Sequence, residues 1–433
     1  KLGKTLDLNT IVTGLNRWTY TVGLGFPNLI SPVVNLAYGL VSNLTYSASS
    51  KYVTDANMIK GMGMMMGAIS RRAVTKADAK NLIKIYGFMD ALGLLTHIVD
   101  SAYNEETKIT KLLVMFQTKA EYINQGSLMI GILKTLTMKD KNGNTVPIWD
   151  AFTINENNAL VWNTDKMGEP NIEFMGDILV SKDGKKLNIS RLGAVIKSEV
   201  SKVHGDYESI MVGKRDPFFK LVALFKTWLP EAAHHRFGKT WFNPSTQTWE
   251  KGRYRSIFSS ETESGEVITP GKAMKEIALS ILKLSQKNSF SGYSEADRTN
   301  MARNIREFQF IALLTSVALL LSSATKDDED EEYRRFLFML INILNKTSID
   351  LAFFADPRAT LKIFDNAIPS FTLIARTADI FDIALDTITG DGEIKSGPFK
   401  GMNKTLKWAA DITPGAAGAI KIYNAGERLF EYR

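Results

Sequence analysis

The feature that most constrains this chain is a run of 17 residues, 308–324, without a charged side chain. Two arginines lie just before it, at 303 and 306, and an acidic run follows it at 327–332. As a helix rising about 1.5 Å per residue, it would be roughly 25 Å long, against about 30 Å for the hydrocarbon core of a bilayer. Gln309 and four hydroxyl side chains also dilute it. The pattern therefore favours the buried central helix of a bundle, with a membrane-crossing helix as the alternative.

Two further apolar segments lie near the start of the chain. Residues 18–50 contain no charge, but their glycines and prolines predict kinked or paired short helices. A methionine-rich stretch follows at 58–66, with glycines interleaved, which indicates deformable core packing. Gly63 and Gly67 also match the spacing of glycines in membrane helix pairs, although we favour core packing.

Helical periodicity recurs along most of the chain. Apolar residues at three- and four-residue steps predict amphipathic helices over 76–104 and 107–138, and helices again over 190–203 and 217–229. Pro230 should end the last of these. Turn sequences at 140–144 and 182–185, beside short apolar runs, instead predict hairpins. The expected fold is mainly α, with multi-helix bundles and a small β-hairpin insertion near residues 138–189.

Breaks in this pattern predict the domain organisation. We expect five parts, in chain order: a helical apolar domain at 1–137, a small β-rich insertion at 138–189, a helical basic and aromatic segment at 190–258, a linker at 259–271 and a helical domain at 272–433. The linker is assigned because its sequence is polar, contains glycine and ends at a proline.

The residues needed for common catalytic and metal sites are sparse. The cysteine count of 0 excludes disulfides, thiolate metal sites and thiol nucleophiles. The 4 histidines lack the spacing of metal ligands on a helix. A stretch similar to a phosphate-binding loop, at 233–240, has Ala233 where the first glycine is needed. We therefore expect a protein that is not an enzyme, with no catalytic residue, metal or cofactor.

Basic and aromatic residues alternate through 214–258. The whole chain has 53 lysines and arginines against 46 acidic residues, a net charge of +7 that favours anionic partners only weakly. The mixture suits a membrane interface, a nucleic-acid strand or a protein partner, unless the aromatic side chains simply pack inward. The candidate interface residues are Lys226, Trp228, Arg236, Trp241, Trp249, Arg253 and Arg255.

Several short elements in the middle third of the chain form a recognisable set. They are Trp-Leu-Pro at 228–230, Arg-Phe-Gly at 236–238, Gly-Arg-Tyr-Arg at 252–255, and the stretches at 146–152 and 204–207. In these elements the chain resembles the large multi-module virion proteins of crAss-like gut bacteriophages. The resemblance implies an internal cargo protein, packaged in the capsid or tail and ejected with the genome, of which this chain is a non-catalytic portion.

This resemblance also implies partners and location. Expected partners are other virion proteins of the portal or tail channel, the host membrane and phage DNA, with no small-molecule substrate. The protein would lie in the virion interior and, after ejection, in the host envelope or cytoplasm. A chain without disulfides, with methionine-rich packing and charge-free helices, suits unfolding, passage through a channel and refolding against lipid. The alternative is a static structural component of the head or tail that binds DNA or neighbouring subunits.

Overall fold

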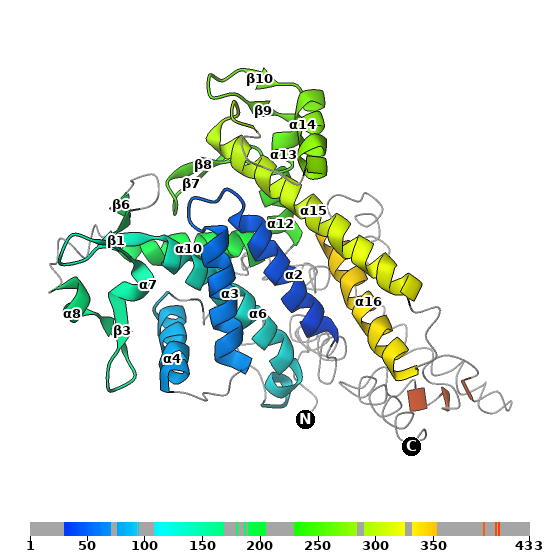
Figure 1. Cartoon of the computed structure of the whole chain (residues 1–433), viewed down its shortest axis with the longest axis horizontal. Helices are drawn as coiled ribbons and strands as arrows, with labels where there is room; N and C mark the ends of the chain where they lie inside the picture. Colours follow the sequence, from blue (N-terminus) through cyan, green and yellow to red (C-terminus); the bar gives the residue numbers. More distant parts are fainter. Residues whose placement is uncertain are drawn as a thin grey trace, which may run out of the picture.

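The structure is a computed structural model. It describes residues 30–70, 76–92, 94, 108–168, 179–180, 186–187, 189–204, 229–283, 290–324 and 331–352, together with 393–394, 403–404 and 406–407. Helices account for 69% of the described residues, and the strands are short, so the mainly-α fold with small hairpins is confirmed. Figure 1 shows the first helices side by side, strands on the left and at the top of the view, and a long helix pair on the right.

Four helices form the N-terminal bundle: α2 (Ile30–Ser47), α3 (Asp55–Ser70), α4 (Lys76–Ala91) and α6 (Lys108–Thr135). The last two confirm the helices predicted over 76–104 and 107–138, in shorter form. Amphipathicity was the wrong expectation for α6, whose residues 122–133 are buried on every side. The reason is that α2, α3 and α10 (Ile189–His204) all pack around it.

Glycine sets the closest helix contact in this bundle, although not at the predicted spacing. A Cβ on Gly61 would lie 2.4 Å from the backbone oxygen of Ser127, so α3 and α6 approach backbone to backbone. By contrast, no atom of the described residues lies within 4 Å of a Cβ built on Gly63 or Gly67. Met58 and Met65 are fully buried beside the contact, in agreement with methionine-rich core packing.

The described part of the charge-free segment is one continuous helix rather than kinked or paired short ones. Helix α2 contains both Pro32 and Gly39. Pro32 lies in its first turn, where a missing N–H costs no helical hydrogen bond. A side chain on Gly39 would collide with Asn124 of α6, so this glycine serves close packing.

Hairpins fill the predicted insertion near residues 138–189. Strands β2 (Thr145–Pro147), β1 (Thr137–Lys139), β5 (Leu179–Val180) and β6 (Lys186–Leu187) form one antiparallel sheet in that order. Strands β3 (Phe152–Ile154) and β4 (Leu160–Trp162) pair separately, and the short helices α7 (Ile148–Ala151) and α8 (Thr164–Met167) flank them. In the turn between β1 and β2, Asp140 accepts backbone hydrogen bonds from Asn142 and Asn144.

The segment 190–258, predicted to be helical, also contains a hairpin. Helix α12 (Leu229–Phe237) leads into β7 (Trp241–Asn243) and β8 (Thr248–Glu250), and α13 (Arg255–Phe258) follows. Asn243 forms the turn, because its Oδ1 accepts hydrogen bonds from the backbone N–H groups of Ser245 and Thr246. This local side-chain bonding competes with a helix.

Pro230 lies in the first turn of helix α12, which begins at Leu229, a position that suits proline. The helix predicted over 217–229 lies almost wholly outside the described residues.

The predicted linker at 259–271 is likewise a folded element. Strands β9 (Ser260–Glu261) and β10 (Val267–Ile268) pair, and α14 (Pro270–Lys283) starts directly afterwards. Gly265 has a φ of 85°, which suits the turn between the strands. Ile268 is buried in a small core with α14 and the start of α15. The polar sequence that suggested a linker therefore belongs to a hairpin at the surface.

The C-terminal part of the described fold is an antiparallel pair of long helices, α15 (Glu295–Ala324) and α16 (Glu331–Ala352) (Figure 1). The hydroxyl groups of Thr315 and Ser348 are 2.8 Å apart across the pair. Helix α16 also packs against α2. The described residues of the predicted domain at 272–433 are thus helical up to Ala352, and nearly all of the remainder lies outside them.

Candidate functional site

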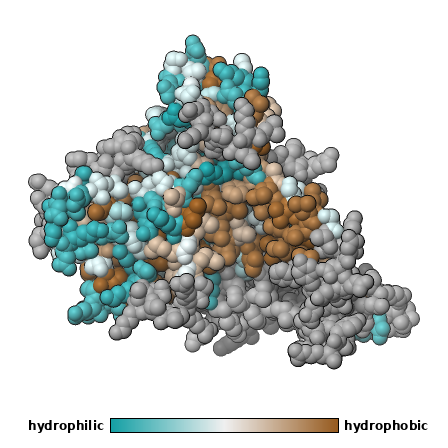
Figure 2. Space-filling view, viewed as in Figure 1, coloured by the Kyte–Doolittle hydropathy of each residue, from teal (hydrophilic) through white to brown (hydrophobic). Residues whose placement is uncertain are grey.

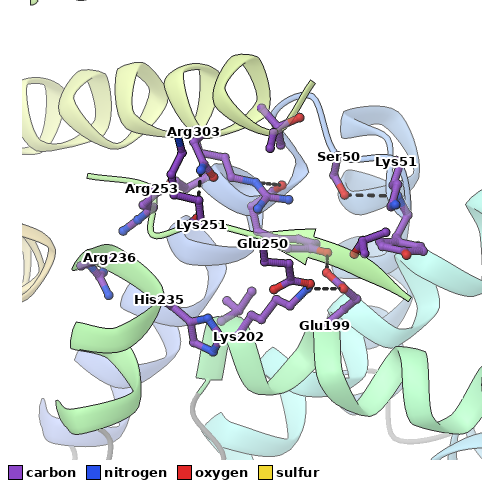
Figure 3. A pocket seen from close by; sticks show the side chains of 18 of the residues that line it. Ser50, Lys51, Glu199, Lys202, His235, Arg236, Glu250, Lys251, Arg253 and Arg303 are labelled. Atoms are coloured by element: carbon purple, nitrogen blue, oxygen red, sulfur yellow. Dashed lines mark hydrogen bonds and ion pairs between the residues drawn. The ribbon is translucent and has the colours of Figure 1, made fainter. Parts of the chain in front are cut away.

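A polar cavity of about 470 Å³ lies where segments distant in sequence meet. Its walls come from α2 and the turn after it, from α10 and α12, from the β7–β8 hairpin and from the first half of α15. Figure 3 shows acidic and basic side chains from α10, β8 and α15 converging on it. Two carboxylates organise these charges: Glu199 on one side and Glu307 on the other.

Glu199 is the centre of the first cluster and is 1% exposed. Its Oε1 accepts a hydrogen bond from Lys202 Nζ at 2.5 Å, and its Oε2 accepts one from the Tyr46 hydroxyl. Lys202 Nζ also lies 2.5 Å from Glu250 Oε1. Because Glu250 further accepts from Asn243 Nδ2 at 2.8 Å, the cluster joins α2, α10 and the β7–β8 hairpin.

The two carboxylates that share Lys202 are perturbed in opposite directions. Burial raises the pKa of Glu199, although the nearby lysine opposes the change. Burial also acts on Glu250, but there Lys202 outweighs it and the pKa is lowered. Burial disfavours the charge on Lys202, yet its two carboxylate neighbours prevail and raise its pKa. The lysine is therefore held in its charged form, with the negative charge concentrated on Glu250.

Glu307 anchors the second cluster and is also 1% exposed. Its Oε1 accepts from Arg253 and, at 3.4 Å, from Arg236. Its Oε2 accepts from the Tyr254 hydroxyl at 2.6 Å. For Arg236, burial disfavours the charge, but Glu307 outweighs it and raises the pKa. The single carboxylate thus pairs with two arginines, both of them predicted interface residues.

Further polar contacts fix α15 to the rest of the fold. Lys251 Nζ lies 2.8 Å from Asp297 at the start of this helix. Arg306, one turn before the apolar stretch, donates to both carboxylate oxygens of Asp55 at 2.6 and 2.9 Å and to the backbone oxygen of Leu44. The first half of α15 is therefore held by ion pairs and hydrogen bonds to both neighbouring parts of the chain.

The predicted interface residues divide into separate groups. Four of them line the cavity: Arg236, Trp241, Trp249 and Arg253. Arg255, the first residue of α13, is half-buried and is not among the cavity residues. Lys226 and Trp228 lie outside the described residues.

The two cavity tryptophans differ in their surroundings. Trp241 packs against the rings of His234 and His235, at centroid distances of 4.4 and 5.6 Å. Trp249 is 67% exposed and contacts Phe242 edge-on. The predicted alternation of aromatic and basic residues thus corresponds to a partly inward-packed hairpin with an aromatic outer face.

Sequence reasoning missed the residues that organise the cavity: Tyr46, Glu199, Lys202, Glu250, Arg303 and Glu307. A signal did exist for Glu199, which falls on the same helical face as the buried Leu192, Val195 and Ile196. Glu307 gave no such signal, because its helical face carries the polar Asn300, Arg303 and Asn304. An acidic residue on an apolar helix face indicates a buried partner.

The second half of α15 contrasts with this polar site, because its apolar side chains are uncovered. Within the described residues, Glu295–Ser323 is long and apolar enough to cross a membrane, and 17% of its most apolar stretch is buried. Figure 2 shows a hydrophobic surface over α2, α15 and α16. The large exposed apolar residues of the helix pair are Leu313, Leu319, Leu320, Phe338, Met339 and Ile349.

Among the described residues, no group of three or more histidine, aspartate or glutamate side chains is arranged to hold a metal ion. Comparison with known proteins found no matching family model, no matching curated protein and no matching solved structure. The geometry of the cavity and of the apolar helix pair is therefore the basis for the functional argument.

Proposed function

We propose that this chain is an internal cargo protein of a crAss-like bacteriophage virion, packaged in the capsid or tail and ejected with the genome, which engages the host envelope through α15 and α16. The observation on which this rests is the uncovered apolar surface of that helix pair. Leu319 and Leu320 are 66% and 69% exposed in the middle of a charge-free run. Such a patch on a folded protein marks a membrane or protein contact.

A bilayer suits this surface in its composition and its borders. The exposed groups are leucine, isoleucine, phenylalanine and methionine, each of which gains roughly 1.5–3 kcal/mol on full burial. The acidic residues 327–332 follow α15 in sequence and include the first two residues of α16, and their charge strongly opposes entry into lipid. We therefore propose that the pair lies along the membrane interface, with the acidic run in water.

The polar half of α15 supports this arrangement. Ion pairs to Asp55 and within the Glu307 cluster fix it to the body of the protein. The apolar half then projects from a fixed base, so binding lipid requires no unfolding of the cavity. The resemblance of the middle of the chain to phage virion proteins supports the same role.

Liposome flotation of the full chain tests the membrane contact. We expect the protein to float with liposomes and the variant Leu319→Glu/Leu320→Glu to lose at least tenfold in bound fraction. A matched control is Val267→Glu/Met274→Glu, which adds the same charges at exposed apolar positions of β10 and α14. Circular dichroism should show all three proteins equally folded. Failure of the unaltered protein to float, or equal loss in both variants, would overturn the membrane role.

Analysis of dissociated particles tests the virion role. Mass spectrometry should detect the protein inside the particle, and its copy number should not follow the symmetry of the portal or tail. A ring of copies with fixed symmetry would instead favour the alternative, a static structural component whose neighbours cover the apolar pair. DNA binding through Arg236 and Arg253 has less support, because both are already paired with Glu307 inside the fold.

A further inference from the structure

The polar cavity has the dimensions of a small-molecule site. Its volume of about 470 Å³ falls within the range of roughly 300–1,000 Å³ that is usual for ligand pockets. Residues more than 250 positions apart in sequence form its walls, which are held together by buried hydrogen bonds such as that from Arg303 Nε to the Tyr46 backbone oxygen. A cavity with such walls is already formed before any ligand arrives.

Most cations around this cavity already have an acidic partner. A carboxylate oxygen lies within 3.4 Å of each member of a set of four: Lys202, Arg236, Lys251 and Arg253. Arg303 differs from them. Within the described part of the chain, no carboxylate oxygen lies within the 4.0 Å that defines an ion pair with its guanidinium. Glu199 and Glu250 act on its charge from farther away, so among these five cations it is the one without a direct ion pair.

The guanidinium of Arg303 is nevertheless held in place. Its Nε donates to the Tyr46 backbone oxygen at 3.2 Å, and its central carbon lies 4.3 Å from the centroid of the Tyr46 ring. Tyr46 is in turn fixed by its hydroxyl bond to Glu199. Figure 3 shows Arg303 pointing from α15 into the cavity. The terminal N–H groups of this side chain make no hydrogen bond to the described residues, so they present a fixed fork of donors.

A second unpaired group lines the same cavity. The hydroxyl oxygen of Thr45 is buried and has no hydrogen-bond partner among the described residues. A buried hydroxyl without a partner is costly, and a ligand atom would relieve that cost. The unpartnered hydroxyl of Thr45 and the donor fork of Arg303, both from residues that line the cavity, therefore point to a polar partner.

We infer that this cavity binds a small molecule carrying a phosphate or carboxylate group, with Arg303 gripping the anion through its terminal nitrogens. A planar fork of donors matches the oxygens of both groups. The rings of Tyr52, Trp241 and Trp249 also line the cavity and favour a ligand whose remainder is flat and apolar. The oxygens of Glu199 and Glu250 already accept hydrogen bonds from Tyr46, Lys202 and Asn243. The anion of the ligand is therefore directed to the wall formed by α15, where Arg303 lies. This site is independent of the proposed membrane role.

Calorimetric titration of the full chain tests this inference with three probes: AMP, inorganic phosphate and adenosine. We expect saturable binding of AMP, weaker binding of phosphate and at least tenfold weaker binding of adenosine, which lacks the anion. Arg303→Met should lower the AMP affinity at least tenfold. The matched control Arg298→Met removes a partly exposed arginine from the same helix and should leave binding unchanged. No saturable AMP or phosphate binding, or equal binding by Arg303→Met, would overturn the site.

Two milder variants keep the test decisive if Arg303→Met does not fold. Arg303→Lys keeps the charge but loses the fork, and Thr45→Val keeps the shape but loses the hydroxyl; each should weaken AMP binding at least threefold. Unchanged affinity in both variants would contradict the assignment. Titration with a short single-stranded oligonucleotide separates ligand classes, since much tighter binding that also depends on Arg303 would replace the small-molecule assignment by a nucleic-acid one. Liposome flotation of Arg303→Lys should match that of the unaltered protein.

Discussion

Helices α6 and α15 are both long and largely apolar, yet the fold treats them in opposite ways. Residues 122–133 of α6 are buried on every side by α2, α3 and α10. The apolar half of α15 is covered only in part, by α16 and α2, and leaves leucines more than half exposed. Apolar composition thus shows that a helix needs an apolar environment, but whether protein or another phase supplies it depends on the neighbouring helices.

The largest effect should come from the contact that makes α6 a core helix. In Gly61→Leu, the added side chain collides with the backbone of α6 at Ser127 and Gly131, which forces α3 away. We expect a loss on the order of 5 kcal/mol, seen as loss of the cooperative transition in thermal and urea unfolding. Gly63→Ala, at an open position of the same helix, should instead change stability by no more than about 1 kcal/mol, in the stabilising direction. Similar behaviour of the two variants would disprove the close helix contact.

The polar half of α15 should respond nearly as strongly. Glu307→Gln leaves Arg236 and Arg253 buried without a counter-charge, which typically costs about 3–5 kcal/mol. The measurement is the free energy of unfolding in urea. Glu263→Gln breaks an exposed pair with Arg298 at 3.6 Å and should cost less than about 1 kcal/mol. A small effect of Glu307→Gln would mean that this half of α15 is not fixed to the body.

The comparison of the two helices has a direct test in matched leucine truncations. Leu133 of α6 is fully buried, so Leu133→Ala should destabilise the fold by about 2–5 kcal/mol. Leu320 of α15 is 69% exposed, so Leu320→Ala should change stability by less than about 0.5 kcal/mol in the absence of lipid. Urea unfolding with and without liposomes measures both changes in stability. With liposomes present, the cost of Leu320→Ala should increase. Equal costs without lipid would show that the apolar half of α15 is covered in solution.

The smallest predicted effect is a loss of stability at acidic pH, which arises at a histidine packed against α2 and α6. His204 is buried beside Asn43 and Glu121; burial lowers its pKa, although Glu121 opposes the change. The unfolded chain then binds the proton more readily than the folded one, so stability falls as pH drops through about 6.5. Between pH 7.5 and 5.5, His204→Gln should lose about 1 kcal/mol less than the unaltered protein. An equal dependence of stability on pH in the two proteins would contradict the assignment.

The sequence predicted the positions of helices and hairpins better than it predicted what packs around them. Three- and four-residue periodicity located α4, α6 and α10, and turn residues located the hairpins near 138–189, because both signals are local. The β7–β8 hairpin was missed because its turn depends on the Asn243 side chain accepting hydrogen bonds from the backbone of Ser245 and Thr246. The linker expected at 259–271 proved to be a hairpin with Ile268 in a core.

The cavity was harder to foresee than the elements around it. It needs Tyr46, Glu199, Glu250 and Arg303, which come from four separate segments, and single-sequence patterns do not report such contacts. Four of the seven interface candidates nevertheless line it. The sequence did not reveal that Arg236 and Arg253 share an acidic partner, because that partner, Glu307, lies on a distant helix.

The ion pair between Arg306 and Asp55 joins two residues that are 251 positions apart in sequence. A polypeptide delivered end first, from a ribosome or through a narrow tube, cannot make that bond until both residues have emerged. Such widely separated pairings form slowly. During that interval α15 keeps its nearer contacts, those of Asp297 and Glu307 with residues 251–254, but lacks its ion pair to the N-terminal bundle.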